Sequence, residues 1–101
     1  MSHYIISPTA SRDLEEISNY FASRNIEAGE RFVEQFAKKC KNIIEFPNIG
    51  RSYAEIAPGL RGVPVDGYII LYRVREAGVE IVRVVSGYQD LESLFVEPGD
   101  E

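Results

Sequence analysis

The chain has 101 residues, a length that suits one domain, and its 45% hydrophobic content with 11% aromatic residues is enough for one compact core. Its 11 lysines and arginines against 16 acids give a net charge of -5, which counts against a general nucleic-acid binder, although a local basic patch could hide in this average. No apolar run approaches the roughly 20 residues of a membrane helix, and the start of the chain lacks a secretion signal. We therefore expect a cytoplasmic protein with a single domain over residues 1–96 and a flexible tail over 97–101.

Few residues suggest metal or redox chemistry. Cys40 is the single cysteine, so an internal disulfide is impossible, which agrees with a reducing cytosol. It falls on an apolar helix face and is expected in the core. His3 has no second His, Cys or spaced carboxylate beside it. Glycine-rich phosphate loops and nucleophile motifs are absent as well, so we expect no metal and no cofactor.

A short strand and an amphipathic helix open the chain. The β-prone run over residues 3–6 is followed by Ser7, which can cap a helix, and Pro8, which is tolerated in its first turn. Apolar residues then recur on one face of a helix of three or four turns. They are Ala10, Leu14, Ile17, Tyr20 and Phe21.

A second helix follows a break over residues 23–25 and stops before Pro47. Its apolar stripe consists of Phe32, Phe36, Cys40 and Ile43, widened by Val33, Ala37 and Ile44. Because the break is short, the two helices are expected to pack as an antiparallel hairpin. We expect the aromatic residues of both helices to lie in the core.

Three antiparallel strands are predicted after a loop over residues 48–59. They cover residues 60–65, 68–75 and 79–85, and the first two are joined by Asp66-Gly67, a strong hairpin signal. Pro64 removes a backbone donor, so the first of these strands should lie at an edge or contain a bulge. The fold class is therefore α+β, in the order β-α-α-β-β-β, with the helical hairpin on one face of an antiparallel sheet and a short C-terminal segment.

The other face of this sheet also needs a cover, because the last two strands are almost continuously apolar. We expect either a partner on this face, or the chain's own N-terminal strand, loop 48–59 and C-terminal segment. Strict alternation of side chains places arginines among its apolar residues. The two groups are Arg73 and Arg75 beside Ile69 and Leu71, and Arg83 beside Val79, Ile81 and Val85.

The residues that punctuate these elements resemble the ParE branch of the ParE/RelE toxin superfamily, which includes plasmid stabilisation proteins. The resemblance runs from about Tyr4 to Phe95, and its motifs are specific as an ordered set rather than singly. They are YIISPTA at 4–10, DLEEI at 13–17, FPNIGR at 46–51, PGLR at 58–61, YIILYRV at 68–74, IVRV at 81–84 and DL at 90–91.

This resemblance implies the toxin of a type II toxin-antitoxin system. It implies a ParD-like antitoxin that wraps a tail across the toxin, a toxin-antitoxin hetero-oligomer, and contact with nucleic acid only through that complex. In the ParE branch the target is DNA gyrase, and in the RelE branch it is mRNA in the ribosomal A site. The antitoxin's identity, the oligomeric state and the surface that contacts the target cannot be read from the residues.

RNA cleavage requires a base, an acid and cations around the reacting phosphate. The strands offer Arg61, Arg73 and Arg83, but arginine is a poor base, and there is no lysine beyond Lys41. Where family members often show basic residues after the last strand, this chain has Tyr88 and Gln89. We therefore predict no catalytic residue and an inhibitor that acts by binding.

Five residues are predicted to bind antitoxin or target: Arg61, Arg73, Arg83, Tyr88 and Gln89. Arg61 and Arg73 would form bidentate pairs with an acidic antitoxin tail, or structural pairs with Glu55, Glu80 or Asp90. For Arg83 a structural or partner-facing pair is favoured over catalysis, and Tyr88 can also be a packing residue. Two other functions stay open, a RelE-like mRNA interferase and a non-toxic member that retains antitoxin binding.

Overall fold

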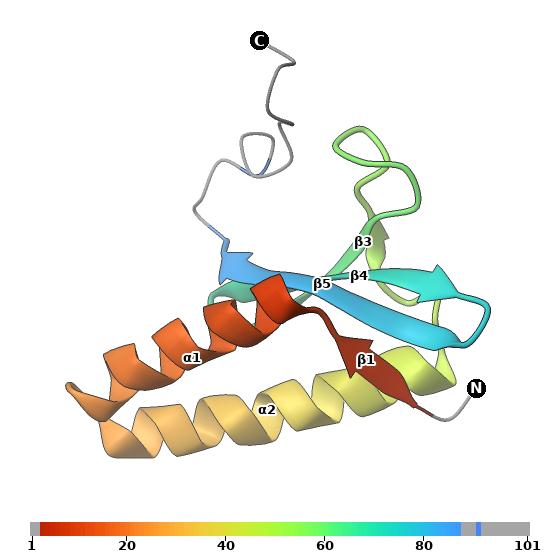
Figure 1. Cartoon of the computed structure of the whole chain (residues 1–101). Helices are drawn as coiled ribbons and strands as arrows, with labels where there is room; N and C mark the ends of the chain where they lie inside the picture. The colour runs from red at the N-terminus through yellow and green to blue at the C-terminus, as the bar shows by residue number, and fades with distance from the viewer. Residues whose placement is uncertain (1–2, 88–90, 92–101) are drawn as a thin grey trace, which may run out of the picture.

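The computed structural model describes residues 3–87 and 91, which form one sheet with both helices on one of its faces (Figure 1). The sheet order is β1-β5-β4-β3-β2. The predicted α+β class and helical hairpin are confirmed. The bounds are β1 Tyr4–Ile6, α1 Pro8–Ala22, α2 Ile26–Glu45, β2 Arg51–Ser52, β3 Arg61–Val65, β4 Tyr68–Arg75 and β5 Gly78–Ser86.

The sheet is mixed because β1 pairs in parallel with β5, whereas β2 to β5 are antiparallel. Asp66 and Gly67 form the β3–β4 turn with φ angles of 48° and 83°, the left-handed geometry that a tight hairpin requires. The two-residue β2 is an addition, since it lies in the segment predicted as a loop. It pairs with β3 only at Arg61 and Gly62, so Pro64 lies beyond that ladder as an edge residue.

Both helices begin at capping residues. The Ser7 hydroxyl accepts a hydrogen bond from the Ala10 N–H at 3.0 Å, and Pro8 follows as the first helical residue. Asn25 caps α2 through the Ala28 N–H, also at 3.0 Å. The helix ends at Glu45, before Pro47, as the sequence predicted.

A first core lies between the helices and the sheet. On α2 its members are the predicted stripe, Phe32, Phe36, Cys40 and Ile43. Burial raises the pKa of the Cys40 thiol to about 12, which keeps it protonated and inert at neutral pH.

Tyr20 was predicted to lie in the core, and this prediction was wrong. Half of the residue is exposed, and the Arg24 guanidinium lies over its ring at 4.3 Å.

A bulge in β5 changes the predicted orientation of Arg83. Leu71 pairs with Arg83 and Tyr72 pairs with Ile81, so Val82 is the extra residue. Val79, Ile81 and Val84 therefore belong to the helix-side core, and Val82 and Val85 pack on the opposite face. The prediction that Arg83 shares a face with Val79, Ile81 and Val85 was wrong, because strict alternation does not survive a bulge.

Ser7 and Asp13 form hydrogen bonds with the edge of β5, past the last β5 residue that pairs with β1. β1 pairs with β5 as far as Ile81, and the Ser7 hydroxyl donates to the Val82 carbonyl at 2.9 Å. Asp13 accepts from the Val84 N–H at 3.0 Å and forms a two-pronged ion pair with Arg83, at 2.8 and 3.0 Å. Asp13 thus replaces a strand neighbour and attaches α1 to β5.

Asp13→Asn is expected to lower the free energy of unfolding by about 2–3 kcal/mol, because it leaves the largely buried Arg83 without its counter-charge. Urea unfolding followed by circular dichroism measures this change. Glu15→Gln is the matched control, since it removes a carboxylate from an exposed position on the same helix. A loss as small as that of the control would show that the Asp13 pair does not hold α1 in place.

Candidate functional site

Arg61, the first of the predicted binding residues, holds the turn that follows α2. Its Nη1 donates to the Gly50 carbonyl at 2.8 Å and to the Asn48 carbonyl at 3.4 Å. The acceptors are therefore backbone carbonyls of residues 46–50, rather than the carboxylates that we expected. The guanidinium is half-buried, so this contact fixes the turn from the sheet side.

Tyr72 fixes the same turn from within the core. Its hydroxyl donates to the Pro47 carbonyl at 2.7 Å and accepts from the Gly50 N–H at 2.9 Å. The residue is fully buried, and burial raises the pKa of its hydroxyl. In the sequence, Tyr72 belongs to an almost continuously apolar run and was expected to be an ordinary strand residue. A tyrosine in so buried a strand nevertheless signals that its hydroxyl needs a hydrogen-bond partner.

Tyr72→Phe should cost about 1–3 kcal/mol of stability, because the Gly50 N–H and the Pro47 carbonyl lose a buried partner. Differential scanning calorimetry checks this, with amide hydrogen exchange at Gly50 as a local probe. Tyr20→Phe is the control and should change stability by less than about 0.5 kcal/mol, because Tyr20 is half-exposed. Unchanged protection of the Gly50 amide in Tyr72→Phe would argue against the proposed role.

The sheet face opposite the helices is covered in part by the chain itself, as in one of the two alternatives that the sequence left open. The loop between β2 and β3 rises on this side (Figure 1). It forms a second cluster that buries Leu71 and Val85 in the sheet, with Leu91 beside them. The loop's contributions are Tyr53, Ile56, Ala57 and Leu60. The alternative in which loop 48–59 covers this face is therefore the one that these residues adopt.

Arg73 supports this covering loop. Its Nε donates to the Pro58 carbonyl at 3.2 Å, again a backbone acceptor. Arg83 pairs with Asp13 on the other side of the sheet, and Arg75 pairs with Glu80 at 2.7 Å. The three predicted arginines thus have separate structural contacts and do not form one cluster. Tyr88 and Gln89, the other two predicted residues, lie outside the described residues.

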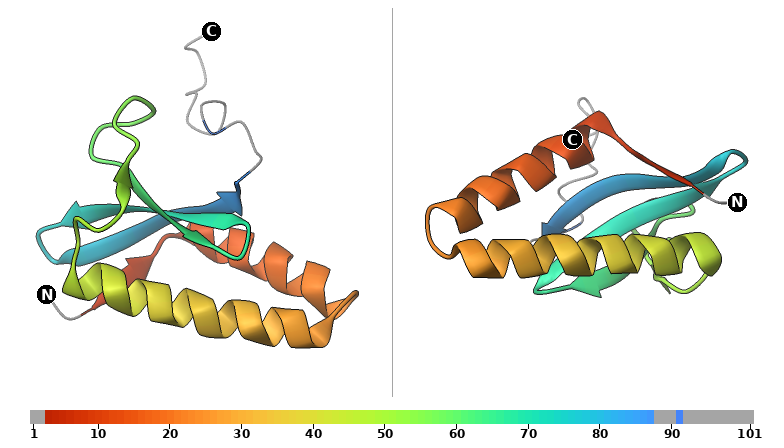
Figure 2. Two further views of the ribbon diagram at one scale, coloured as in Figure 1. Left: turned by 180° about the vertical axis from the view of Figure 1, so that it is seen from behind. Right: turned by 90° about the horizontal axis from the view of Figure 1, so that it is seen from below.

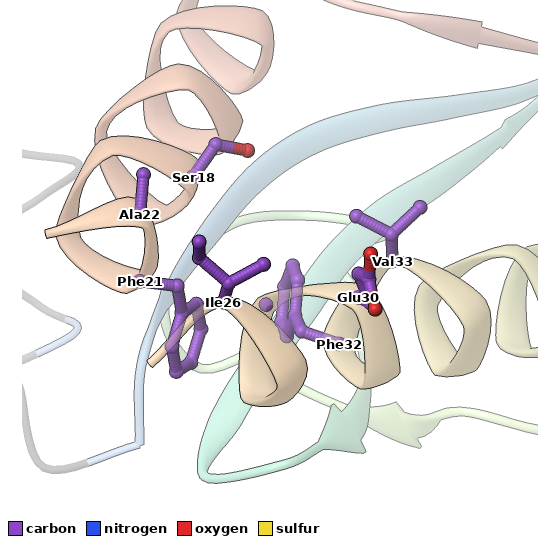
Figure 3. A pocket seen from close by; sticks show the side chains of 8 residues that line it. Ser18, Phe21, Ala22, Ile26, Glu30, Phe32 and Val33 are labelled. Atoms are coloured by element: carbon purple, nitrogen blue, oxygen red, sulfur yellow. The ribbon is translucent and has the colours of Figure 1, made fainter. Parts of the chain in front are cut away.

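An apolar groove lies between the two helices near their connection (Figure 3). Its volume is about 350 Å³. Ile26 and Val33 of α2 remain 67% and 58% exposed there. The wall from α1 is built of small residues, Ser18 and Ala22, and Phe21 and Phe32 add aromatic surface. We call this feature, lined by Ser18, Phe21, Ala22, Ile26, Gly29, Glu30, Phe32 and Val33, the hairpin groove.

The groove exists because the helices meet only near their connection and then diverge, as the view from below shows (Figure 2). At the connection they approach closely, since a Cβ at Gly29 would lie 2.9 Å from the Phe21 Cβ. The sequence did not predict this site, because Val33 lies next to the core stripe of α2 and was expected to be buried. Ile26 lies seven residues before Val33, a spacing that puts both aliphatic residues on one side of the second helix, and this was a usable signal.

Two other kinds of site find no support in the described part of the chain. Within residues 3–87 and 91, no three His, Cys, Asp or Glu side chains gather closely enough to hold a metal ion. Neither described helix combines the length and apolar content that crossing a bilayer requires.

The fold is a small α+β domain, and comparisons with known proteins show the family to which it belongs. The family model for the ParE toxin of the type II toxin-antitoxin system parDE matches residues 4–91. Toxin ParE1 of Mycobacterium tuberculosis (strain CDC 1551 / Oshkosh) is 30% identical over 93 residues, which cover 90% of this chain and 95% of the relative. Toxin ParE3 of Caulobacter vibrioides is 25% identical over 92 residues, covering 90% and 92%.

A solved structure of the chromosomal ParDE toxin-antitoxin system from P. aeruginosa shares the fold. The TM-score is 0.71 at 19% identity, over 85% of this chain and 96% of the other. The chain belongs to the ParE toxin family of type II toxin-antitoxin systems. The predicted resemblance is thereby confirmed.

Proposed function

We propose that this chain is a cytoplasmic toxin that inhibits DNA gyrase by binding it, and that a ParD-like antitoxin neutralises it in a hetero-oligomeric complex. The proposal extends the family membership to a target and a partner. It is supported by the match to the ParE family over most of the chain and by the fold shared with a ParDE system.

The observation that best supports inhibition by binding is that the strand arginines contact groups of the chain itself. RNA cleavage would need cations free to converge on a phosphate. Instead, Arg61 and Arg73 bond to loop carbonyls, and Arg83 forms an ion pair within the chain. These three side chains point to different parts of the molecule and serve the fold.

Among the described residues, Tyr72 and His3 are also poorly suited to transfer protons in RNA cleavage. Tyr72 is buried, its hydroxyl bridges two backbone groups, and its pKa is raised, so it is a poor base. His3 precedes β1 and lies beside Gly78, and within the described residues the structure shows no carboxylate bonded to it. The geometry thus favours a protein that occupies its target over one that cleaves RNA.

Induction of the chain alone is expected to arrest growth with loss of gyrase-dependent supercoiling and with DNA damage, while translation continues at first. Topoisomer gels of a reporter plasmid, a DNA-damage reporter and pulse labelling of new protein measure the three effects. Purified chain should likewise inhibit purified gyrase. Co-expression of the antitoxin from the adjacent reading frame is the control and should restore all of them.

Tyr88→Phe separates binding from catalysis. If Tyr88 served as a base for RNA cleavage, removal of its hydroxyl would abolish activity, whereas inhibition by binding should change by no more than a few-fold. Normal supercoiling beside collapsing translation, with codon-phased cuts in primer extension, would overturn the gyrase proposal in favour of an mRNA interferase. Unimpaired growth with retained antitoxin binding would instead identify a member that has lost toxicity.

A further inference from the structure

We propose that the turn after α2, together with the lysines that precede it, is the surface by which this chain contacts its protein target, and that the target meets it with an acidic patch around an apolar pocket. The inference rests on the proposed function in taking gyrase as that target, and it goes beyond it by assigning the contact surface and the chemistry of the partner. We call Lys38, Lys41, Phe46 and Ile49 the turn surface.

The turn surface lies at the end of α2 that is far from its connection with α1 (Figure 1). α2 has 20 residues and is therefore about 30 Å long, so the hairpin groove near the connection is a separate feature. Lys38, Lys41 and Phe46 lie on the side of α2 that faces away from its core stripe, and all three are exposed. Ile49 follows in the turn and is exposed as well.

The turn is held rigidly although its large side chains point to solvent. The Tyr72 hydroxyl and the Arg61 guanidinium bond to its backbone from the sheet, as described above. Gly50 lets the chain come close to Tyr72, because a Cβ there would lie 2.6 Å from the Tyr72 hydroxyl oxygen. Phe46 and Ile49 nevertheless remain 63% and 55% exposed. Apolar side chains on a fixed backbone lose little conformational entropy when a partner binds them, which favours a recognition role.

The charge of this segment is opposite to that of the whole chain. All three lysines of the sequence occur within residues 38–41. Residues 38–51 contain these lysines, Arg51 and one acid, Glu45, which gives a net charge of +3 in a chain of -5. The dipole of α2 does not account for the lysines, because it acts on the last turn of a helix and that turn contains no basic residue. The segment therefore favours a partner with an acidic surface.

The residue types of the turn surface favour a protein over a nucleic acid. Phenylalanine is enriched at the centres of protein interfaces, where large side chains enter pockets, and charged residues lie at their rims. Phe46 and Ile49 with lysines beside them have this composition. A DNA duplex is held by cations on its phosphates, and two exposed apolar side chains would add little to that contact. The partner is thus expected to offer an apolar pocket with acidic residues around it.

Ile49→Glu tests the apolar part of the turn surface. The concentration of this variant that halves supercoiling by purified gyrase should rise at least about tenfold, because a carboxylate replaces an apolar contact and meets an acidic partner. The variant should fold, since Ile49 is exposed and the turn is held by Tyr72 and Arg61. Val33→Glu is the matched control, because Val33 is 58% exposed on the other half of α2, and its inhibition should stay within about twofold.

Lys38→Gln combined with Lys41→Gln tests the charge. Inhibition of gyrase should weaken by about three- to tenfold and depend less on salt concentration, because two attractive contacts with an acidic partner are removed. Glutamine is close to lysine in helix propensity, so this variant keeps the fold and tests the surface independently of Ile49→Glu. Arg12→Gln combined with Arg31→Gln, an equal change of charge at exposed positions elsewhere on the helices, is the control and should inhibit like the unmodified chain. Circular dichroism and the urea midpoint establish that each variant is folded.

The outcomes separate this inference from the proposed function. Unchanged inhibition by Ile49→Glu and by the lysine variant would overturn the turn surface as the contact, while leaving gyrase as the target. A loss in Val33→Glu as large as that in Ile49→Glu would overturn it too, since the effect would not be specific to this surface. Binding of the unmodified chain to a fluorescent DNA duplex without gyrase, weakened in the same variants, would show that the surface contacts DNA and would overturn a protein as its partner. Failure of the unmodified chain to inhibit gyrase would overturn both proposals.

Discussion

The attachment of α1 to the edge of β5 is the interaction on which the arrangement of this fold depends. β1 pairs with β5 only as far as Ile81, and the next backbone groups of β5 would otherwise face α1 without partners. Ser7 and Asp13 supply those partners from the helix, and Arg83 completes the contact. A charged residue in a mostly apolar strand is thereby neutralised, and the start of α1 is fixed against the sheet.

The position of α1 in turn creates the hairpin groove. α1 follows the edge of β5, whereas α2 packs across the sheet through Phe32, Phe36 and Cys40. The helices therefore touch only near their connection, where Gly29 lets Phe21 come close. Beyond that point they separate (Figure 2), and Val33 of α2 remains 58% exposed. The hairpin groove is thus a consequence of two different attachments to one sheet.

The elements of this fold could be predicted from the sequence because their signals are local. Ser7, Pro8 and Pro47 set helix ends, and Asp66-Gly67 sets the tight turn, by rules that depend on neighbouring residues alone. The parallel pairing of β1 was not predicted, since pairing depends on distant segments. Nor was the extra residue at Val82, because a bulge is defined by what stands on the adjacent strand.

The candidate site was less predictable, for a related reason. The arginines were expected to meet carboxylates, and two of them instead bond to backbone carbonyls, which every residue carries and which therefore leave no trace in the sequence. Val33 lies close enough to the apolar stripe of α2 to be counted with it. Whether that side of the helix is covered depends on where α1 crosses, and this is decided by Asp13, 20 residues earlier in the chain.

Because Val82 is an extra residue, the alternation of β5 side chains between the two faces of the sheet shifts by one position there. Before it, odd-numbered side chains such as Ile81 point to the helices, and after it even-numbered ones such as Val84 do. Leu71 pairs with Arg83 and Tyr72 with Ile81, so β5 holds one residue more than β4 along this stretch. That extra residue lets one strand place Ile81 and Val84 in the core beneath the helices while the Val84 N–H still reaches Asp13 on α1.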